Sequence, residues 1–209
     1  MSEWDAADAT DRIKQLIPRV LTPALFFVIP AFFGAVLFSR EILTLVFGAE
    51  YAGAWLVLII LMGEKLLQAP HVILGRSLQG VDRPGLAARA GVVAMVLNLL
   101  LNLVLVWSFG IVGAAVATAI SFAVNTLLHA TYLSRFVTIR VPYREIGWCV
   151  VASVGMALVL IVARSAVVID TVPRLAAAVL LGVVVYSGIV VLFRPFRVRA
   201  LDTVKEVSK

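Results

Sequence analysis

The 209-residue chain is too apolar for a soluble globular domain, because 62% of its residues are hydrophobic, 14% are charged and its mean hydropathy is +1.06. Soluble domains have about 45–50% apolar and about 25% charged residues, and a chain of this size cannot bury such an excess. A net charge of +6 would suggest nucleic acid in a soluble protein. Here the basic residues stand between apolar runs, a pattern typical of membrane topology, and we expect no nucleic-acid partner.

The chain begins with a polar segment, residues 1–19, whose few apolar residues recur at helical spacing. We expect a cytoplasmic N-terminal segment with a short helix in the membrane interface. The first long apolar run, residues 20–38, follows it and contains Pro23 and Pro30. Because proline interrupts helical hydrogen bonding, both residues predict a kink in this span and are candidate hinges.

Later apolar runs are also long enough to cross a bilayer at about 1.5 Å per residue. They cover residues 51–79, 86–107, 111–132, 146–163 and 175–193. The first of these is too long to stand upright, and we expect Pro70 to interrupt it and to act as a third hinge. Three residues separate the next two, which predicts a tight antiparallel pair. The sequence therefore predicts an all-α, polytopic bundle of about six transmembrane helices over residues 20–193, with a basic cytoplasmic tail at 194–209.

Lysine and arginine are distributed unevenly between the two ends of these spans. If the spans alternate strictly, one side receives Arg12, Lys14, Arg19, Arg76, Arg83, Arg89, Arg135, Arg140, Arg144, Arg194, Arg197, Arg199, Lys205 and Lys209. The opposite side receives Arg40, Arg164 and Arg174, and Lys65 lies inside a span. Cytoplasmic connectors carry the excess of basic residues, so both termini are expected in the cytoplasm and the spans in the plasma membrane.

The second span carries a stripe of polar residues. At about 100° per residue, one side of this helix holds Glu64, Lys65, Gln68, His71, Arg76 and Gln79. A charge at mid-membrane costs about 2.5–3.5 kcal/mol, so such residues face protein or a wet cavity. We interpret the stripe as lining a central cavity for an anionic or sugar-bearing ligand. Alternatively, Glu64 forms an ion pair with Lys65 or with another helix that only fixes helix packing. Adjacent residues point about 100° apart, so we expect Glu64 and Lys65 to pair poorly. Arg76 would then lie at the cytoplasmic interface.

Three asparagines extend the set of candidate cavity-lining residues. Asn98 and Asn102 lie one turn apart on the third span, and Asn125 lies on the fourth. Asparagine amides in lipid usually bond neighbouring helices, and contact with a sugar hydroxyl is the alternative. His129 stands by itself near the inner end of its span, and we interpret it as a solvated or interfacial histidine rather than a proton relay.

The sequence contains no recognisable catalytic or cofactor site. Two histidines far apart, without cysteine or carboxylate at ligand spacing, make a metal site improbable. No glycine-rich phosphate loop or nucleophile elbow is present, so we expect neither catalytic residues nor a cofactor. The single cysteine, Cys149, lies in an apolar run and is expected to be a buried structural thiol.

Several motifs resemble those of a known transporter family. The sequence LQGVDRPG at residues 78–85 continues to NLLLNL at 98–103 and FGIVGAAVAT at 109–118. These motifs, with residues 2–4 and 47–52, resemble the Wzx-like oligosaccharide and polysaccharide lipid flippases of the MATE-related MOP superfamily. The resemblance covers residues 1–135, and the last two spans match only in hydrophobicity.

This resemblance implies a function for the chain. Members of the family have two lobes around a cavity, and the chain resembles their C-terminal part. It implies a fragment or half-transporter that flips lipid-linked oligosaccharide or polysaccharide precursors across the cytoplasmic membrane. The implied partners are membrane lipid, the lipid-linked sugar and a missing N-terminal lobe or second chain, with Lys65 or Arg76 pairing with a diphosphate.

Other functions are also compatible with these residues. A cation-coupled multidrug or metabolite exporter of the same superfamily would use Glu64 and His71 as coupling residues. A non-transporting membrane scaffold subunit suits the short chain. A membrane-bound transferase is a more distant alternative.

Overall fold

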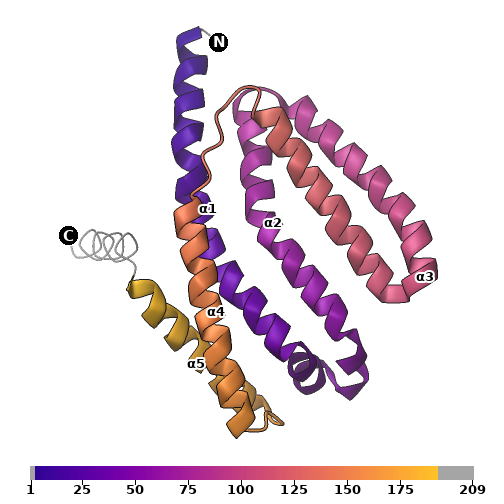
Figure 1. Cartoon of the computed structure of the whole chain (residues 1–209). Coiled ribbons are helices and arrows are strands. Elements are labelled where there is room, and N and C mark those ends of the chain that lie inside the picture. Colours follow the sequence, from indigo (N-terminus) through magenta and orange to yellow (C-terminus); the bar gives the residue numbers. More distant parts are fainter. Residues whose placement is uncertain (1–2, 193–209) are drawn as a thin grey trace.

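The computed structural model describes residues 3–192, with side chains from residue 12 onward, and Figure 1 shows its helices. The basic tail predicted at 194–209 lies outside the described residues. Within 3–192 the chain is helical and contains no strand. Figure 1 and the helix contacts place the elements in the order α3, α2, α1, with α4 and α5 against the other side of α1. This arrangement confirms an all-α polytopic bundle.

Helix α1 (Glu3–Ile42) contains both the predicted interfacial segment and the first predicted span, which follow one another without a break, and it is kinked at Phe38. Pro23 and Pro30 lie inside the helix, and the residue with non-helical backbone angles is Phe38 (φ −118°, ψ 16°). Proline at position 30 cannot donate an amide hydrogen to the carbonyl of Phe26, one turn earlier. The hydroxyl of Tyr186 from α5 donates to that carbonyl instead, at 2.8 Å. This bond ties α1 to α5.

Two short elements connect α1 to α2. The π-helical turn η1 (Leu43–Phe47) is followed by the 3₁₀ turn η2 (Ala49–Ala54). Gly48 between them has φ of +120°, a backbone region that residues with a side chain rarely adopt. A Cβ atom at this position would also lie 2.7 Å from the Glu50 carboxylate. The reversal at this end of the bundle therefore depends on glycine.

Helix α2 (Trp55–Gly80) continues through Pro70, so the predicted interruption there is wrong. Packing along the helix maintains it although one amide hydrogen bond is lost. A short turn leads into α3 (Pro84–Leu133), which begins with proline at a position where its missing N–H is not needed.

Helix α3 is folded back on itself, as Figure 1 shows. Gly110 (φ 56°, ψ −135°) separates a first arm, residues 84–109, from a second arm, residues 111–133. A Cβ atom at Gly113 would lie 1.9 Å from the carbonyl oxygen of Leu105, so the arms meet at backbone distance beside the turn. This confirms the predicted antiparallel pair.

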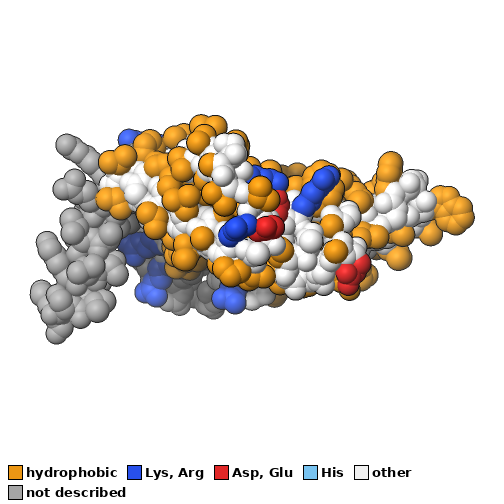
Figure 2. All heavy atoms as spheres, turned by 90° about the horizontal axis from the view of Figure 1, so that it is seen from below, with side chains coloured by type: hydrophobic (Ala, Val, Ile, Leu, Met, Phe, Trp, Pro, Cys, Tyr) orange, Lys and Arg blue, Asp and Glu red, His pale blue; other side chains and the backbone are white. Residues whose placement is uncertain are grey.

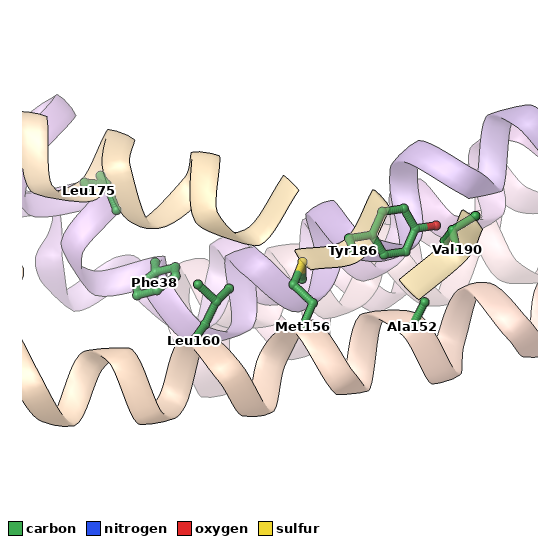
Figure 3. Close-up of a cluster of buried hydrophobic side chains, with 7 residues drawn as sticks. All are labelled: Phe38, Ala152, Met156, Leu160, Leu175, Tyr186 and Val190. Atoms are coloured by element: carbon green, nitrogen blue, oxygen red, sulfur yellow. The ribbon is translucent and has the colours of Figure 1, made fainter. Parts of the chain in front are cut away.

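The remaining helices are α4 (Tyr143–Ala166) and α5 (Val172–Val191). Between them and α1 lies a cluster of buried side chains, shown in Figure 3: Phe38, Ala152, Met156, Leu160, Leu175, Tyr186 and Val190. Cys149 is buried on α4, as predicted.

Large apolar side chains cover much of the outer surface. On the first arm of α3, Leu99, Leu103 and Trp107 are 71%, 76% and 92% exposed. Such surfaces are incompatible with water but suit lipid tails. Among the described residues, five helical segments are long and apolar enough to span a membrane, and one of them is the folded α3, which makes two crossings. The chain is therefore a multi-pass membrane protein.

The two ends of the bundle differ in charge. Figure 2 views the end that carries η1 and η2, where basic and acidic side chains lie close together among apolar ones. Arg164 forms an ion pair with Glu41 and donates to the carbonyl of Leu37 at 2.7 Å. Arg174 pairs with Asp170. The predicted basic clusters within the described residues lie at the other end, where α2 meets α3 and α3 meets α4.

Candidate functional site

The predicted polar stripe on α2 is divided by the fold. Glu64 is 7% exposed, and His71 is half-buried against α3. Lys65, Gln68 and Arg76 are exposed on an adjacent face of the helix. Residues 64 and 71 are two turns apart and share one helix face, whereas 65 and 76 point roughly 100–120° away. Thus α2 presents one polar face to protein and another to the surface of the chain.

The exposed face of α2 and the facing side of α1 form a groove of about 630 Å³. Its lining is Val20, Ala24, Phe27, Val28, Ala31, Met62, Lys65, Gln68, Ala69, Val72 and Ile73. Lys65 and Gln68 are the polar residues of this lining. The groove therefore places one cation and one amide inside a membrane-spanning, otherwise apolar surface.

Lys65 also contacts its neighbour in sequence. Its Nζ atom lies 3.4 Å from Oε1 of Glu64, so the expectation that adjacent residues are poorly placed to pair is wrong. The long, flexible lysine stem bridges the angle between the two positions. Because the Lys65 side chain is 45% exposed, it remains available to a further anion.

The three predicted asparagines lie in two different places. On the first arm of α3, the amide nitrogen of Asn102 donates to the backbone carbonyl of Asn98 at 2.9 Å and to its side-chain oxygen at 3.0 Å. These two amides therefore bond within their own helix rather than to a neighbour. Asn125 lies on the second arm, one turn before His129, and its Oδ1 atom is buried.

His129 is buried by protein, so its interpretation as a solvated histidine is wrong. It is 4% exposed, and its ring centroid lies 4.7 Å from that of His71. The spacing of Ser121, Asn125 and His129, four residues apart, was the available sequence signal, because it places all three on one helix face. Sequence reasoning missed this buried cluster because it treated His129 by itself.

A second, apolar groove of about 470 Å³ lies between α1, α4 and α5, and sequence reasoning did not predict it. Phe26, Phe27 and Pro30 from α1 face Met156 on α4 and Tyr186 on α5. Figure 3 shows Met156 and Tyr186 directed into this region.

Two of the candidate hinge prolines, Pro70 and Pro23, lie outside the lining of these two grooves, and the described residues do not meet the requirements of a metal site. Pro70 lies beside a further apolar cavity between α1, α2 and α3, and Pro23 is exposed on α1. Within residues 3–192, no group of three or more His, Cys, Asp or Glu side chains is placed to hold a metal ion.

Comparisons with known proteins identify flippases as similar proteins. The chain is 52% identical over 197 residues, 94% of its length, to the "Probable low-salt glycan biosynthesis flippase Agl15" of Haloferax volcanii. It is 30% identical over 156 residues, 73% of its length, to the "Probable flippase AglR" of the same organism. Its fold matches the solved structure of the lipid II flippase MurJ in an inward closed conformation, with a TM-score of 0.77, 17% identity and 93% of the chain covered. No protein-family model matches the chain.

These comparisons confirm the predicted resemblance to lipid flippases and correct its extent. The similarity to Agl15 covers 94% of the chain and therefore reaches into α4 and α5, beyond the predicted limit at residue 135. The chain spans 42% of the length of Agl15, 33% of AglR and 42% of MurJ.

Proposed function

We propose that the chain forms part of a membrane transporter that flips lipid-linked oligosaccharide or polysaccharide precursors across the cytoplasmic membrane. The observation that carries this proposal is the 52% identity to a glycan-biosynthesis flippase over nearly the whole chain. The basic clusters at one end of the bundle and the paired charges at the other support cytoplasmic termini.

The two grooves suit the two parts of such a substrate. A lipid-linked sugar carries a polar, anionic head group on a long apolar tail. Lys65 in the α1–α2 groove supplies a cation for a phosphate group, and Gln68 supplies donors and an acceptor for sugar hydroxyls. The apolar groove between α1, α4 and α5 offers a surface for the tail.

The α1–α2 groove requires a second wall. A cavity that opens alternately to the two sides of a membrane lies between two lobes. In this chain the groove with Lys65 lies on the open side of α1 and α2. We propose that an N-terminal lobe or a second chain covers it, and that Pro23, Pro30 and Pro70 allow the helices to bend as the cavity opens and closes.

The proposal is tested in cells that lack the chain and receive it back together with its transporter partner. Flipping is measured as the fraction of lipid-linked glycan that a membrane-impermeant glycosidase reaches from outside. Lys65→Ala removes a charge-assisted hydrogen bond of about 1.5–3 kcal/mol, so we expect flipping to fall by roughly 10- to 100-fold.

Two matched variants control this experiment. Lys65→Arg keeps the positive charge and should retain most activity, and Arg174→Ala removes an exposed charge outside the groove and should leave flipping unchanged. Full flipping by Lys65→Ala would remove Lys65 from the substrate path. Proton-driven drug efflux with unaltered glycan distribution would instead favour the exporter, and a stable complex without transport would favour a scaffold subunit.

A further inference from the structure

The two histidines of the whole chain meet inside the bundle although 58 positions separate them in sequence. Their ring centroids lie 4.7 Å apart with the planes at 76°, and the ring of His71 also lies 4.7 Å from that of Phe122. The ring of His129 packs against α2 at Gly75, where a Cβ atom would lie at an ordinary contact distance of 3.6 Å from Nε2 of His129. The contact lies between α2 and the second arm of α3.

The position of His71 places it opposite Asn125. Phe122 and His129 are seven residues apart, about 10 Å along the helix, and a ring that touches both must lie beside the turn between them. That turn carries Asn125, and Ser121 lies one turn earlier on the same face. We call His71, Ser121, Asn125 and His129 the histidine seam.

Several buried polar atoms of the histidine seam lack a hydrogen-bond partner among the described residues. Ser121 and His129 are each 4% exposed. Nδ1 of His71, Oγ of Ser121 and Oδ1 of Asn125 are buried and, within the described part of the chain, have no hydrogen-bond partner. Buried polar atoms are normally hydrogen-bonded, so this arrangement indicates a site that takes up a small polar ligand.

The charged groups around the seam are few. On α2, Glu64 shares the face of His71, while Lys65 and Arg76 lie on the exposed side. Between Arg89 and His129, α3 carries no titratable residue, and Tyr132 follows one turn later. On α1, the residues packed beside this part of α2 and α3 are Ile17, Leu21 and Leu25, and the basic residues nearest to them in sequence, Lys14 and Arg19, keep their charge over the pH range in which histidine titrates. The histidines and Glu64 are therefore the groups whose charge can change within this interface.

We propose that the histidine seam binds a single proton, shared between the imidazoles of His71 and His129. The proton comes from water and adds to a ring nitrogen without breaking any bond in the protein. The side-chain oxygens of Asn125 and Ser121 accept hydrogen bonds from the protonated pair. One proton enters rather than two because like charges at this separation repel strongly.

A proton suits the seam better than a metal ion. The site offers two imidazoles and neutral oxygens, without a thiolate or a third histidine, which is a weak donor set for a transition metal. The inference does not rest on the proposed function, because proton binding by the seam is measurable without transport.

The test is nuclear magnetic resonance of the full chain, labelled with ¹⁵N-histidine and held in lipid nanodiscs. Two histidines give two sets of ring signals, so no assignment ambiguity arises once His129→Gln has identified one set. In the wild-type chain we expect both rings to respond together to the first proton, with the second proton entering at least about one pH unit lower. His129→Gln should leave a single uncoupled transition at a shifted midpoint.

A second pair of variants tests the role of the amide. Asn125→Leu removes an acceptor that stabilises the protonated form, so the first midpoint should move to lower pH. Asn102→Leu changes the same residue type outside the seam and should leave the histidine signals unchanged.

Two results would overturn the proposal. Either the two rings titrate independently, each unaffected by substitution of the other, or neither takes up a proton above pH 5. If the rings fail in this way but both shift on addition of one equivalent of Zn²⁺, the seam is a metal site instead.

Discussion

The hydrogen bond from the Tyr186 hydroxyl to the backbone of α1 forms where Pro30 leaves a carbonyl without its helical donor. Its contribution to the free energy of unfolding can therefore be measured by substituting Tyr186 and Pro30 separately and together. Proline at position 30 leaves the carbonyl of Phe26 without its usual amide donor, and the Tyr186 hydroxyl takes that place at 2.8 Å. Tyr186 is 4% exposed, so water does not readily replace it. Tyr186→Phe should therefore remove the donor that α5 supplies to this carbonyl.

The expected cost follows from the energies of such bonds. Hydrogen bonds between membrane helices contribute about 0.6 kcal/mol on average and up to about 1.7 kcal/mol. Because the Tyr186 side chain is buried, we expect a value near the upper end, about 1.5 kcal/mol, or roughly tenfold in the unfolding equilibrium. Pro30→Ala restores an amide hydrogen, so in that background Tyr186→Phe should cost only about 0.5 kcal/mol. The resulting coupling energy is about 1 kcal/mol.

The assay is the unfolding of all four combinations in mixed micelles, titrated with a denaturing detergent. Tyr143→Phe is the matched control, because the same atom is removed from a side chain that is 77% exposed. It should leave the free energy of unfolding unchanged. If Tyr186→Phe costs the same with Pro30 and with alanine at that position, the hydroxyl does not replace the missing amide and this reasoning fails.

Two further predictions concern the α3 hairpin and the orientation in the membrane. Gly113→Ala introduces a Cβ atom 1.9 Å from the Leu105 carbonyl oxygen, so the two arms must separate. The free energy of unfolding should therefore fall by about 1–3 kcal/mol. Gly91→Ala, with open space at its Cβ position on the same helix, should not destabilise the chain, and equal loss in both variants would contradict the close approach. Thr138→Cys, in the basic α3–α4 connector, should resist a membrane-impermeant maleimide in intact cells and react after lysis. Ser165→Cys, exposed at the opposite end, should react in intact cells, and the reverse pattern would invert the proposed topology.

Much of the fold follows from local properties of the sequence. Apolar runs of sufficient length must form helices in lipid, because every backbone polar group needs an internal partner. The three residues between the runs 86–107 and 111–132 allow only a tight reversal, and Gly110 supplies it with positive φ. The effect of Pro70 was not predictable in this way, because packing along α2 maintains the helix through a residue that disfavours it.

The candidate site required the tertiary structure. Helical spacing correctly placed Glu64, Lys65, Gln68 and His71 on one broad side of α2, but it cannot say which part of that side a neighbouring helix covers. The position of α3 leaves His71 half-buried against its second arm, and Glu64 on the same face is buried. The position of α1 decides that Lys65 and Gln68 line a groove. The contact between His71 and His129 joins residues far apart in sequence, and a local pattern contains no information about such a pair. Periodicity therefore determines which residues can share a face, whereas the packing of helices determines what that face meets.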